Sequence, residues 1–256
     1  MRHINAVRNI KMEKSALRIL GIRIDNLSKS EINNWLKSVC DNSPSRKFIT
    51  TLNPEIVLKA HRDKKYREII NKADLNICDG FGLKALLRIK GEKIKSRYTG
   101  VELVDYVLRL AKEKNINVLS VVWKKSLSST QEIKEAIEKK YGFQVQAIQF
   151  QNPKDFFDNK KSKEAEIVFV NFGAPWQEKF IFENRCKFPK AKILVGIGGA
   201  LDFLTGKMRR APRWMQKAGL EWFWRLLQEP KRIRRIINAV LVFSWVVLTS
   251  DKRQKK

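Results

Sequence analysis

The chain has 256 residues, 43% hydrophobic and 31% charged, a composition that excludes disorder for most of its length. This length suits one large α/β domain with an appendage, or two small domains. Its 53 Lys and Arg residues against 26 Asp and Glu give a formal net charge of +27, which predicts a polyanionic partner: nucleic acid, an anionic membrane surface or a phosphorylated substrate. Three dispersed cysteines and two histidines argue against a disulfide framework or a zinc site and favour a reducing compartment.

Neither a signal peptide nor a membrane-spanning helix is expected. Residues 1–15 have no continuous apolar core. The longest apolar run, 236–248, rises about 20 Å as a helix, short of a hydrocarbon core of roughly 30 Å, so we expect it to lie in a membrane interface. The expected location is cytoplasmic, peripheral on the inner face of the plasma membrane.

Along the chain, short apolar runs alternate with helical patterns, which predicts a Rossmann-like, mostly parallel sheet flanked by helices. Strands are predicted at residues 17–24, 47–51, 75–77, 117–122, 144–150, 167–171 and 192–196. Helices are predicted at 29–41 (opened by Ser28), 54–72, 100–114, 127–140, 175–187 and 212–228. A change of composition after Gly206 divides the chain into an α/β core, 1–206, and a basic, tryptophan-rich helical appendage, 207–256.

Polar or glycine-rich turns follow four of the predicted strands. They read TLNPE, CDGFG, FGAPWQE and IGGALDF in chain order. Because ligands of open α/β sheets bind beyond the carboxyl ends of the strands, we expect these turns to converge on one rim.

The first two turns carry candidate chemistry. Asp79 is either a general base whose pKa is lifted by apolar neighbours or the first residue of a local Asx turn, and both interpretations stay open. Thr51 and Asn53 have the hydrogen-bonding groups to hold a sugar or phosphate. Taken alone, Asn53 is better explained as the cap of a helix that begins at Pro54.

The remaining candidates are weaker signals for an anion. Gln177 lies in the first turn of a helix whose free N–H groups would face the rim, although a plain turn explains it equally well. Gly198 and Gly199 lack the spacing of a dinucleotide fingerprint. Arg97 precedes a Thr-Gly turn, where a phosphate clamp is plausible and a solvated arginine is the default.

Beyond residue 206, apolar residues recur at helical spacing, with Arg225, Arg232 and Arg235 beside them. One interpretation is a helix packed on the core whose arginines reach water. The other is an amphipathic element at an anionic bilayer, with arginines on lipid phosphates. We favour the second, because the stripe continues into the apolar run and ends in basic residues.

In order, these blocks resemble the WecG/TagA/CpsF family of bacterial glycosyltransferases over roughly residues 17–240. The C-terminal half carries the most specific matches, in FGAPWQEKF, GIGGALDFLTGKMRRAP and GLEWFWRLLQEPKRIRR. Upstream, TLNPEIV, ADLNICDGFG and RYTGVEL fall where the family has its earlier blocks.

The resemblance implies an inverting hexosyltransferase that moves N-acetylmannosamine or a related sugar from a UDP-sugar to a sugar on undecaprenyl diphosphate, for teichoic acid, common antigen, capsule or exopolysaccharide. It implies Asp79 as the base and Thr51 as a second catalytic position. Substrate binding is then expected at Asn53, Arg97, Gln177, Gly198, Gly199, Arg225, Arg232 and Arg235. No cofactor and no metal are expected, since no D-x-D pair is evident and cations would neutralise the leaving diphosphate.

Three departures from the family pattern keep alternatives open. Val122 and Trp123 stand in place of glycines, Leu52 in place of a proline, and AIQFQNPKDF in place of an H-G-Y-F-like block. A divergent or non-catalytic, membrane-associated paralogue is the first alternative. A nucleic-acid-binding protein is the second and weaker one, because no signature of such a module occurs. The sequence does not decide whether the protein is a homo-oligomer.

Overall fold

The computed structural model describes residues 16–152 and 160–254. Its strands are β1 Ala16–Ile19, β2 Ile22–Asp25, β3 Lys47–Leu52, β4 Leu75–Cys78, β5 Val118–Trp123, β6 Gln146–Phe150, β7 Ile167–Asn171 and β8 Ile193–Gly196. Its longer α-helices are α2 Lys29–Asp41, α3 Pro54–Arg62, α4 Lys64–Asn71, α5 Phe81–Ile89, α6 Gly100–Glu113, α7 Thr130–Tyr141, α9 Trp176–Asn184, α12 Glu221–Gln228 and α14 Phe243–Gln254. Shorter ones are α8 Lys160–Glu164, α10 Ala200–Leu204, α11 Arg213–Ala218 and α13 Ile233–Ile237.

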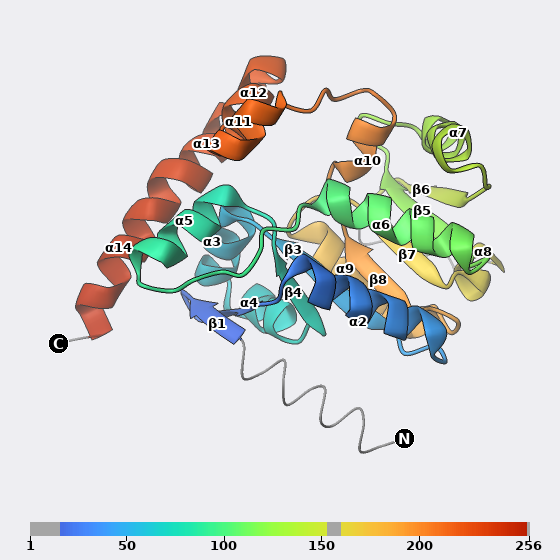
Figure 1. Ribbon diagram of the computed structural model, residues 1–256, viewed down its shortest axis with the longest axis horizontal. Coiled ribbons are helices and arrows are strands. Elements are labelled where there is room, and N and C mark those ends of the chain that lie inside the picture. Colours follow the sequence, from blue (N-terminus) through green and yellow to red (C-terminus); the bar gives the residue numbers. More distant parts are fainter. Residues whose placement is uncertain (1–15, 153–159, 255–256) are drawn as a thin grey trace.

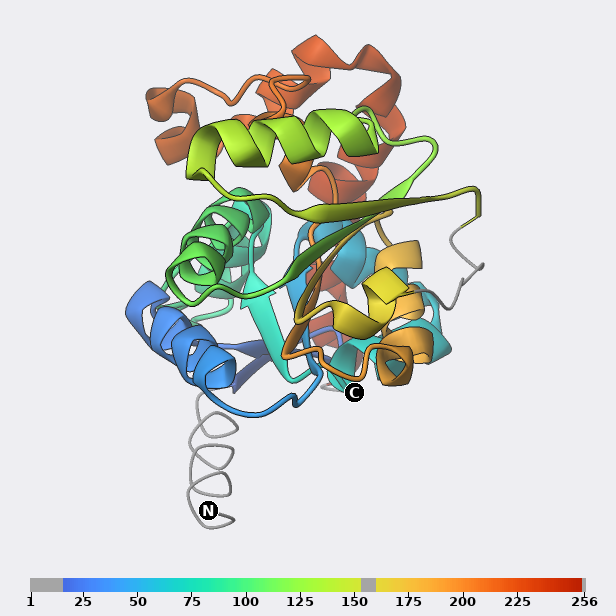
Figure 2. The same ribbon diagram turned by 90° about the vertical axis from the view of Figure 1, so that its right-hand side faces the viewer.

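Six of these strands form one sheet in the order β4-β3-β8-β7-β5-β6, and every neighbouring pair in it is parallel. The predicted α/β class is therefore confirmed. Helices cover both faces: in Figure 2 the blue α2 and green α6 lie on one side of the sheet and the gold α9 on the other. The apolar residues of α2, α6 and α7 form one buried cluster with the sheet, and those of α9 pack on the opposite face.

Local backbone geometry divides three segments that the sequence pattern predicts as continuous. The strand predicted at 17–24 is the antiparallel hairpin β1–β2, because Leu20 and Gly21 both have positive φ and reverse the chain. The helix predicted at 54–72 ends at Asp63, whose side chain accepts the Tyr66 N–H and starts α4. The third segment, 212–228, breaks at Gly219 in a left-handed conformation between α11 and α12.

Strand register brings the four polar turns together as predicted. Leu52 at the end of β3 pairs with Cys78 at the end of β4, and Val170 in β7 pairs with Gly196 at the end of β8. The turns that follow therefore leave the sheet at one rim. Val122 in β5 is level with Asn171, so the turn after β5 joins the same rim.

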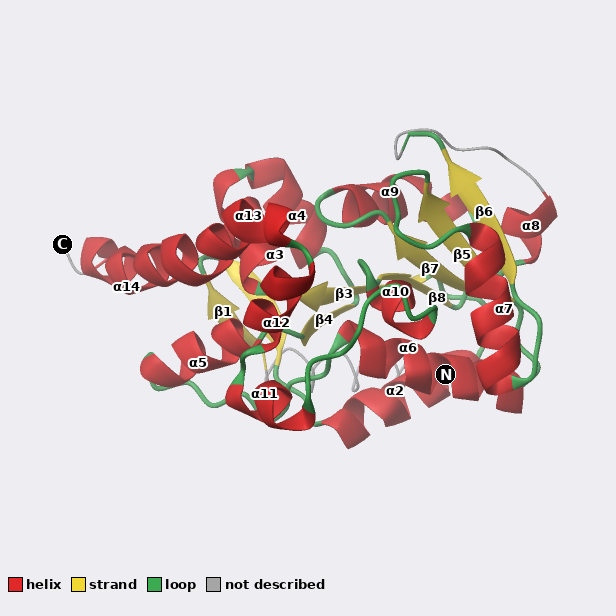
Figure 3. Ribbon diagram, turned by 90° about the horizontal axis from the view of Figure 1, so that it is seen from above, coloured by secondary structure: helices red, strands yellow, loops and turns green. Residues whose placement is uncertain are grey.

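A long C-terminal helix runs along one side of the molecule (Figures 1 and 3). It comprises α13, a π-helical turn at Asn238–Val242 and α14, so it is longer than the apolar run alone predicts. Among the described residues one stretch, Ile233–Ser250, is long and apolar enough to cross a membrane by length and composition. Phe243 and Val247 are nevertheless buried against the core.

The expected basic appendage needs one correction. The C-terminal helix is apolar, and the basic residues concentrate before it and in its first turn, between Lys207 and Arg235. Phe243 and Val247 of this helix lie in one buried cluster with residues of α3 and α5. The division of the chain at residue 206 stays a prediction.

Candidate active site

Two hollows meet at Asp79 on the rim of the sheet. The first, of about 280 Å³, is mainly polar and is lined by the ends of β3, β7 and β8 and the turn after β5. The second, of about 440 Å³, is mainly apolar and lies between α5 and the C-terminal helices. The two hollows share the residues Asn53, Glu55, Asp79, Glu221, Arg225 and Arg235. We call them the polar hollow and the apolar hollow.

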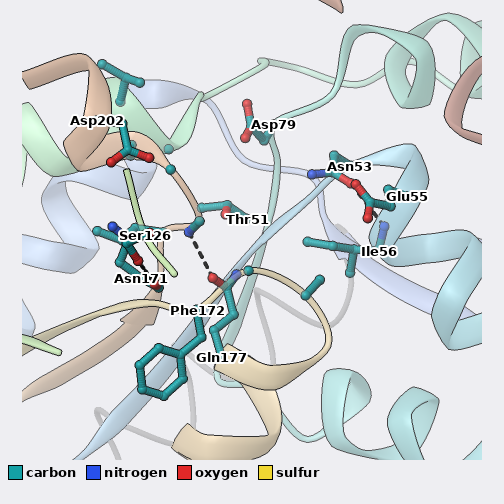
Figure 4. Close-up of a pocket in the computed structure, with 18 of the residues that line it drawn as sticks. Thr51, Asn53, Glu55, Ile56, Asp79, Ser126, Asn171, Phe172, Gln177 and Asp202 are labelled. Atoms are coloured by element: carbon teal, nitrogen blue, oxygen red, sulfur yellow. Dashed lines mark hydrogen bonds between the residues drawn. The ribbon is translucent and has the colours of Figure 1, made fainter. Parts of the chain in front are cut away.

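The position of Asp79 depends on close packing between two turns. Its backbone N–H donates to the Leu52 carbonyl at 2.8 Å, which ties the end of β4 to the end of β3. The next residue, Gly80, has no room for a side chain, since a Cβ there would lie 2.5 Å from Pro54 Cδ. The glycine after Asp79 therefore lets this turn pack closely on the turn at Asn53 and Pro54. Asp79, Asn53 and Thr51 lie around one hollow in Figure 4.

Burial of the Asp79 carboxylate raises its pKa to about 6, against the opposing effects of Arg225, Arg97 and a hydrogen bond from the Gly100 N–H. The nearby Glu221 raises this pKa further. A carboxylate with a pKa near neutrality is a stronger base than an exposed one and is still ionised at pH 7.

Thr51 and Gln177 both line the polar hollow with Asp79, yet their polar atoms bond to the protein. The Thr51 hydroxyl donates to the Gly196 carbonyl at 3.1 Å. The Gln177 side chain donates to Glu178 at 2.6 Å and accepts the Gly198 N–H at 2.8 Å. Together they fix the glycine turn after β8, so a positioning role fits them at least as well as direct contact with a ligand.

Asn53 has both of the roles that its sequence context suggests. Its side-chain oxygen caps α3 by accepting the Ile56 N–H at 3.0 Å. Asn53 also borders both hollows. The cap engages only its side-chain oxygen. Gly198 and Gly199 line the polar hollow beside it.

Arginines reach the cleft from the core and from the C-terminal helices, and ion pairs hold two of them. Arg97 donates to Glu221 at 2.7 Å, and Arg235 binds Glu55 through two nitrogens at 2.9 and 3.2 Å. Arg225 lies 4.9 Å from the ring centre of Phe203 and borders both hollows. The side chain of Arg232 lies outside the described part of the structure.

The replacements at Val122 and Trp123 leave the polar hollow open. Val122 is buried in the core beneath the rim. The Trp123 ring packs against the other face of the sheet, and its indole N–H donates to the Gln151 carbonyl at 3.2 Å. Trp123 therefore borders the polar hollow, which keeps a volume of about 280 Å³ beside it.

Several cleft residues were not among those that the sequence singled out: Glu55, Ser126, Asn171, Asp202 and Glu221. Three of them, Glu55, Asp202 and Glu221, fall inside the blocks TLNPE, IGGALDF and GLEW, where a carboxylate without an assigned role was the available signal. Over residues 16–152 and 160–254, no group of three or more potential metal-ligating side chains converges.

A carboxylate of raised pKa and several arginines at the rim of a parallel α/β sheet are typical of enzymes that bind anionic substrates. The chain belongs to the glycosyl transferase WecG/TagA/CpsF family, whose sequence model matches residues 17–256.

Two relatives share one name, N-acetylglucosaminyldiphosphoundecaprenol N-acetyl-beta-D-mannosaminyltransferase. The protein of Staphylococcus aureus (strain MRSA252) is 31% identical over 248 residues, 93% of this chain and 94% of its own. That of Bacillus subtilis (strain 168) is 29% identical over 215 residues, 81% of each chain.

Asp79→Asn is expected to stabilise the protein above pH 6. Because the folded-state pKa of Asp79, about 6, lies above its ordinary value of 3.8, ionisation between these pH values favours the unfolded chain. Removing the charge should raise the free energy of unfolding by about 1–3 kcal/mol at pH 8 and leave it unchanged below pH 4. Urea unfolding at both pH values measures the difference.

Asp105→Asn is the control of opposite sign. Although burial acts to raise the pKa of Asp105, hydrogen bonds from Lys140, Tyr141 and Arg109 lower it to about 2. This variant should lose stability at pH 8. Equal stability of wild type and Asp79→Asn at pH 8 would contradict the raised pKa.

Proposed function

We propose that the protein transfers N-acetylmannosamine from UDP to the sugar of N-acetylglucosaminyl-diphosphoundecaprenol, with inversion at the anomeric carbon. The names of its relatives support the sugar and the acceptor. The observation that carries the proposal is the place of Asp79, whose carboxylate borders a polar and an apolar hollow at once. A nucleotide sugar and a lipid-linked acceptor need such a junction.

In the proposed step, the Asp79 carboxylate accepts the proton of the acceptor hydroxyl. The hydroxyl oxygen forms a bond to the anomeric carbon on the face opposite UDP, and the bond from that carbon to the diphosphate breaks. UDP departs with the bonding electron pair, and Asp79 returns the proton to solvent. Positive charge from Arg225, which lines the polar hollow, offsets the charge that develops on the diphosphate.

The contrast between the two hollows suggests which substrate each one holds. The polar hollow, with its glycine turn and hydroxyl groups, suits the nucleotide sugar. The apolar hollow is lined by Phe81, Leu220, Trp222, Ile236 and Val240, among others. These side chains suit the first isoprene units of the acceptor, and Arg97 and Arg235 of the same hollow suit its diphosphate.

An anionic membrane surface is proposed to deliver this lipid, on the inner face of the plasma membrane. Exposed apolar side chains follow one another at helical spacing along the C-terminal helix: Ile233, Ile237, Leu241, Trp245 and Leu248. We call them the apolar stripe. The opposite side of the helix packs on the core through Phe243 and Val247. Such a helix lies in an interface with its free face toward lipid.

The transferase assay uses the full chain, UDP-N-acetylmannosamine and the lipid-linked acceptor in vesicles. Asp79→Asn should lower kcat by at least 100-fold, because the acceptor hydroxyl then has no base. Asp105→Asn, outside the cleft, should retain the wild-type rate. If wild type shows no turnover with any UDP-sugar, or if Asp79→Asn keeps more than a tenth of its rate, the proposed chemistry is wrong and a non-catalytic partner becomes the better interpretation.

Membrane binding depends on the apolar stripe rather than on net charge alone. Replacing both Leu241 and Trp245 by Gln should weaken binding to phosphatidylglycerol vesicles by more than tenfold. The apolar side chains that would be buried in lipid are then absent. Replacing Lys134 and Lys139 of α7 by Gln should change it little. Cosedimentation with vesicles, compared with binding to single-stranded DNA, gives the measurement. Tight DNA binding without vesicle binding would support the nucleic-acid alternative.

A further inference from the structure

Asn171 has an unused hydrogen-bonding group in the wall of the polar hollow. It is the last residue of β7, is 5% exposed and lines the hollow with Thr51 and Ser126. Its buried amide nitrogen has no hydrogen-bond partner within the described part of the chain. Because unpaired buried amides are unfavourable and uncommon, a group of this kind beside a cleft indicates a ligand that completes its hydrogen bonding.

The turn after β5 is held in place above this amide. The Ser126 N–H donates to the Trp123 carbonyl at 2.8 Å and closes the turn. The Ser126 hydroxyl donates to the Asn171 carbonyl at 3.1 Å, so the turn and the end of β7 form one rigid wall. Lys125 and Leu127 of the same turn also line the hollow.

Asn171 lies apart from Glu55, and the charged side chain labelled on its own side of Thr51 in Figure 4 is Asp202. In Figure 4, Asn171 and Ser126 lie on one side of Thr51, and Asn53 and Glu55 lie on the other. A nucleotide sugar whose diphosphate lies near Arg225 can extend its nucleoside away from Arg225 and toward the wall at Asn171. The wall at Asn171 provides a neutral amide, a hydroxyl and the apolar side chain of Leu127, and the charged side chains of Lys125 and Asp202 also line this part of the hollow.

We propose that Asn171 is a binding residue for the base of the nucleotide donor, with its side-chain amide on the polar edge of the uracil ring. This inference rests on the proposed function and extends it. A primary amide presents a donor and an acceptor side by side, and uracil presents a carbonyl oxygen beside an imide N–H. The two edges are complementary, and the ring satisfies the unpaired amide nitrogen of Asn171.

Calorimetric titration of the full chain with UDP and with inorganic pyrophosphate tests this assignment. Asn171→Leu keeps the volume and removes both hydrogen-bonding atoms, so its Kd for UDP should rise by at least tenfold while its Kd for pyrophosphate stays at the wild-type value. Asn171→Asp retains the shape with acceptors alone, and its preference for UDP over CDP should fall, since cytosine offers an amino donor at the corresponding edge.

Ser120→Ala is the matched control. Ser120 lies on the neighbouring strand β5, is fully buried and has a hydroxyl with no partner among the described residues, but it does not line the polar hollow. Its Kd for UDP should equal that of wild type. Thermal unfolding identifies any variant that fails to fold.

Three results would overturn the assignment. If wild type binds UDP and both Asn171 variants bind it equally well, the inference fails while the proposed transferase stands. If the variants raise KM for the nucleotide sugar without changing Kd for UDP, Asn171 contacts the sugar instead of the base. If wild type does not bind UDP at all, the proposed donor fails and this inference fails with it.

Discussion

The chemistry proposed for the cleft depends on the burial of the Asp79 carboxylate among positive and negative side chains. Asp79 loses hydration at the rim of the sheet, and this loss outweighs the attraction of Arg225 and Arg97, so its pKa stands near 6. The balance is local and geometric. It needs the β3 and β4 turns in contact, which Gly80 permits, and it needs Arg97 partly neutralised by Glu221. If either feature were lost, the same carboxylate would be a weaker base.

Two ion pairs of opposite polarity connect the core with the C-terminal helices across this cleft. In one, the core supplies the cation, Arg97, and α12 supplies Glu221. In the other, the core supplies Glu55 and α13 supplies Arg235. The helix that contains Arg235 also carries the apolar stripe. The ion pair of Arg235 with Glu55 therefore links the surface proposed to meet lipid to a residue that borders the same hollows as Asp79. The C-terminal helices therefore complete the cleft, because they supply Glu221, Arg225 and Arg235 to its lining.

The sequence was sufficient to predict the features that follow from two considerations. One is hydrophobic periodicity, and the other is that ligands of open α/β sheets bind beyond the carboxyl ends of the strands. Six of the seven predicted strands form the parallel sheet, and the convergence of four turns and the grouping of Asp79, Thr51 and Gln177 at one rim also follow from those two considerations. Local backbone geometry was harder to predict, because single residues such as Gly21 and Gly219 with positive φ divide patterns that look continuous.

The hydrogen-bond and ion-pair partners of the site side chains could not be predicted, because they are set by contacts between residues far apart in the chain. Gln177 bonds to the Gly198 backbone, and Arg97 pairs with Glu221, 124 positions away. That either residue also binds a ligand stays a prediction. Asn171 gave no signal, because it reads as the end of an ordinary buried strand. Only the arrangement of neighbouring strands shows that its amide borders a cleft.

The central claim is that a single carboxylate, buried at the junction of the two hollows, removes the proton from the acceptor. Its most direct test is the dependence of kcat/KM on pH for sugar transfer by the wild-type protein, which reports ionisations of the free enzyme. The account predicts a tenfold rise per pH unit below pH 6, an inflection at about 6 and a plateau above it. A profile that is flat from pH 5 to 8, or one whose inflection lies near the ordinary aspartate value of about 4, would contradict it.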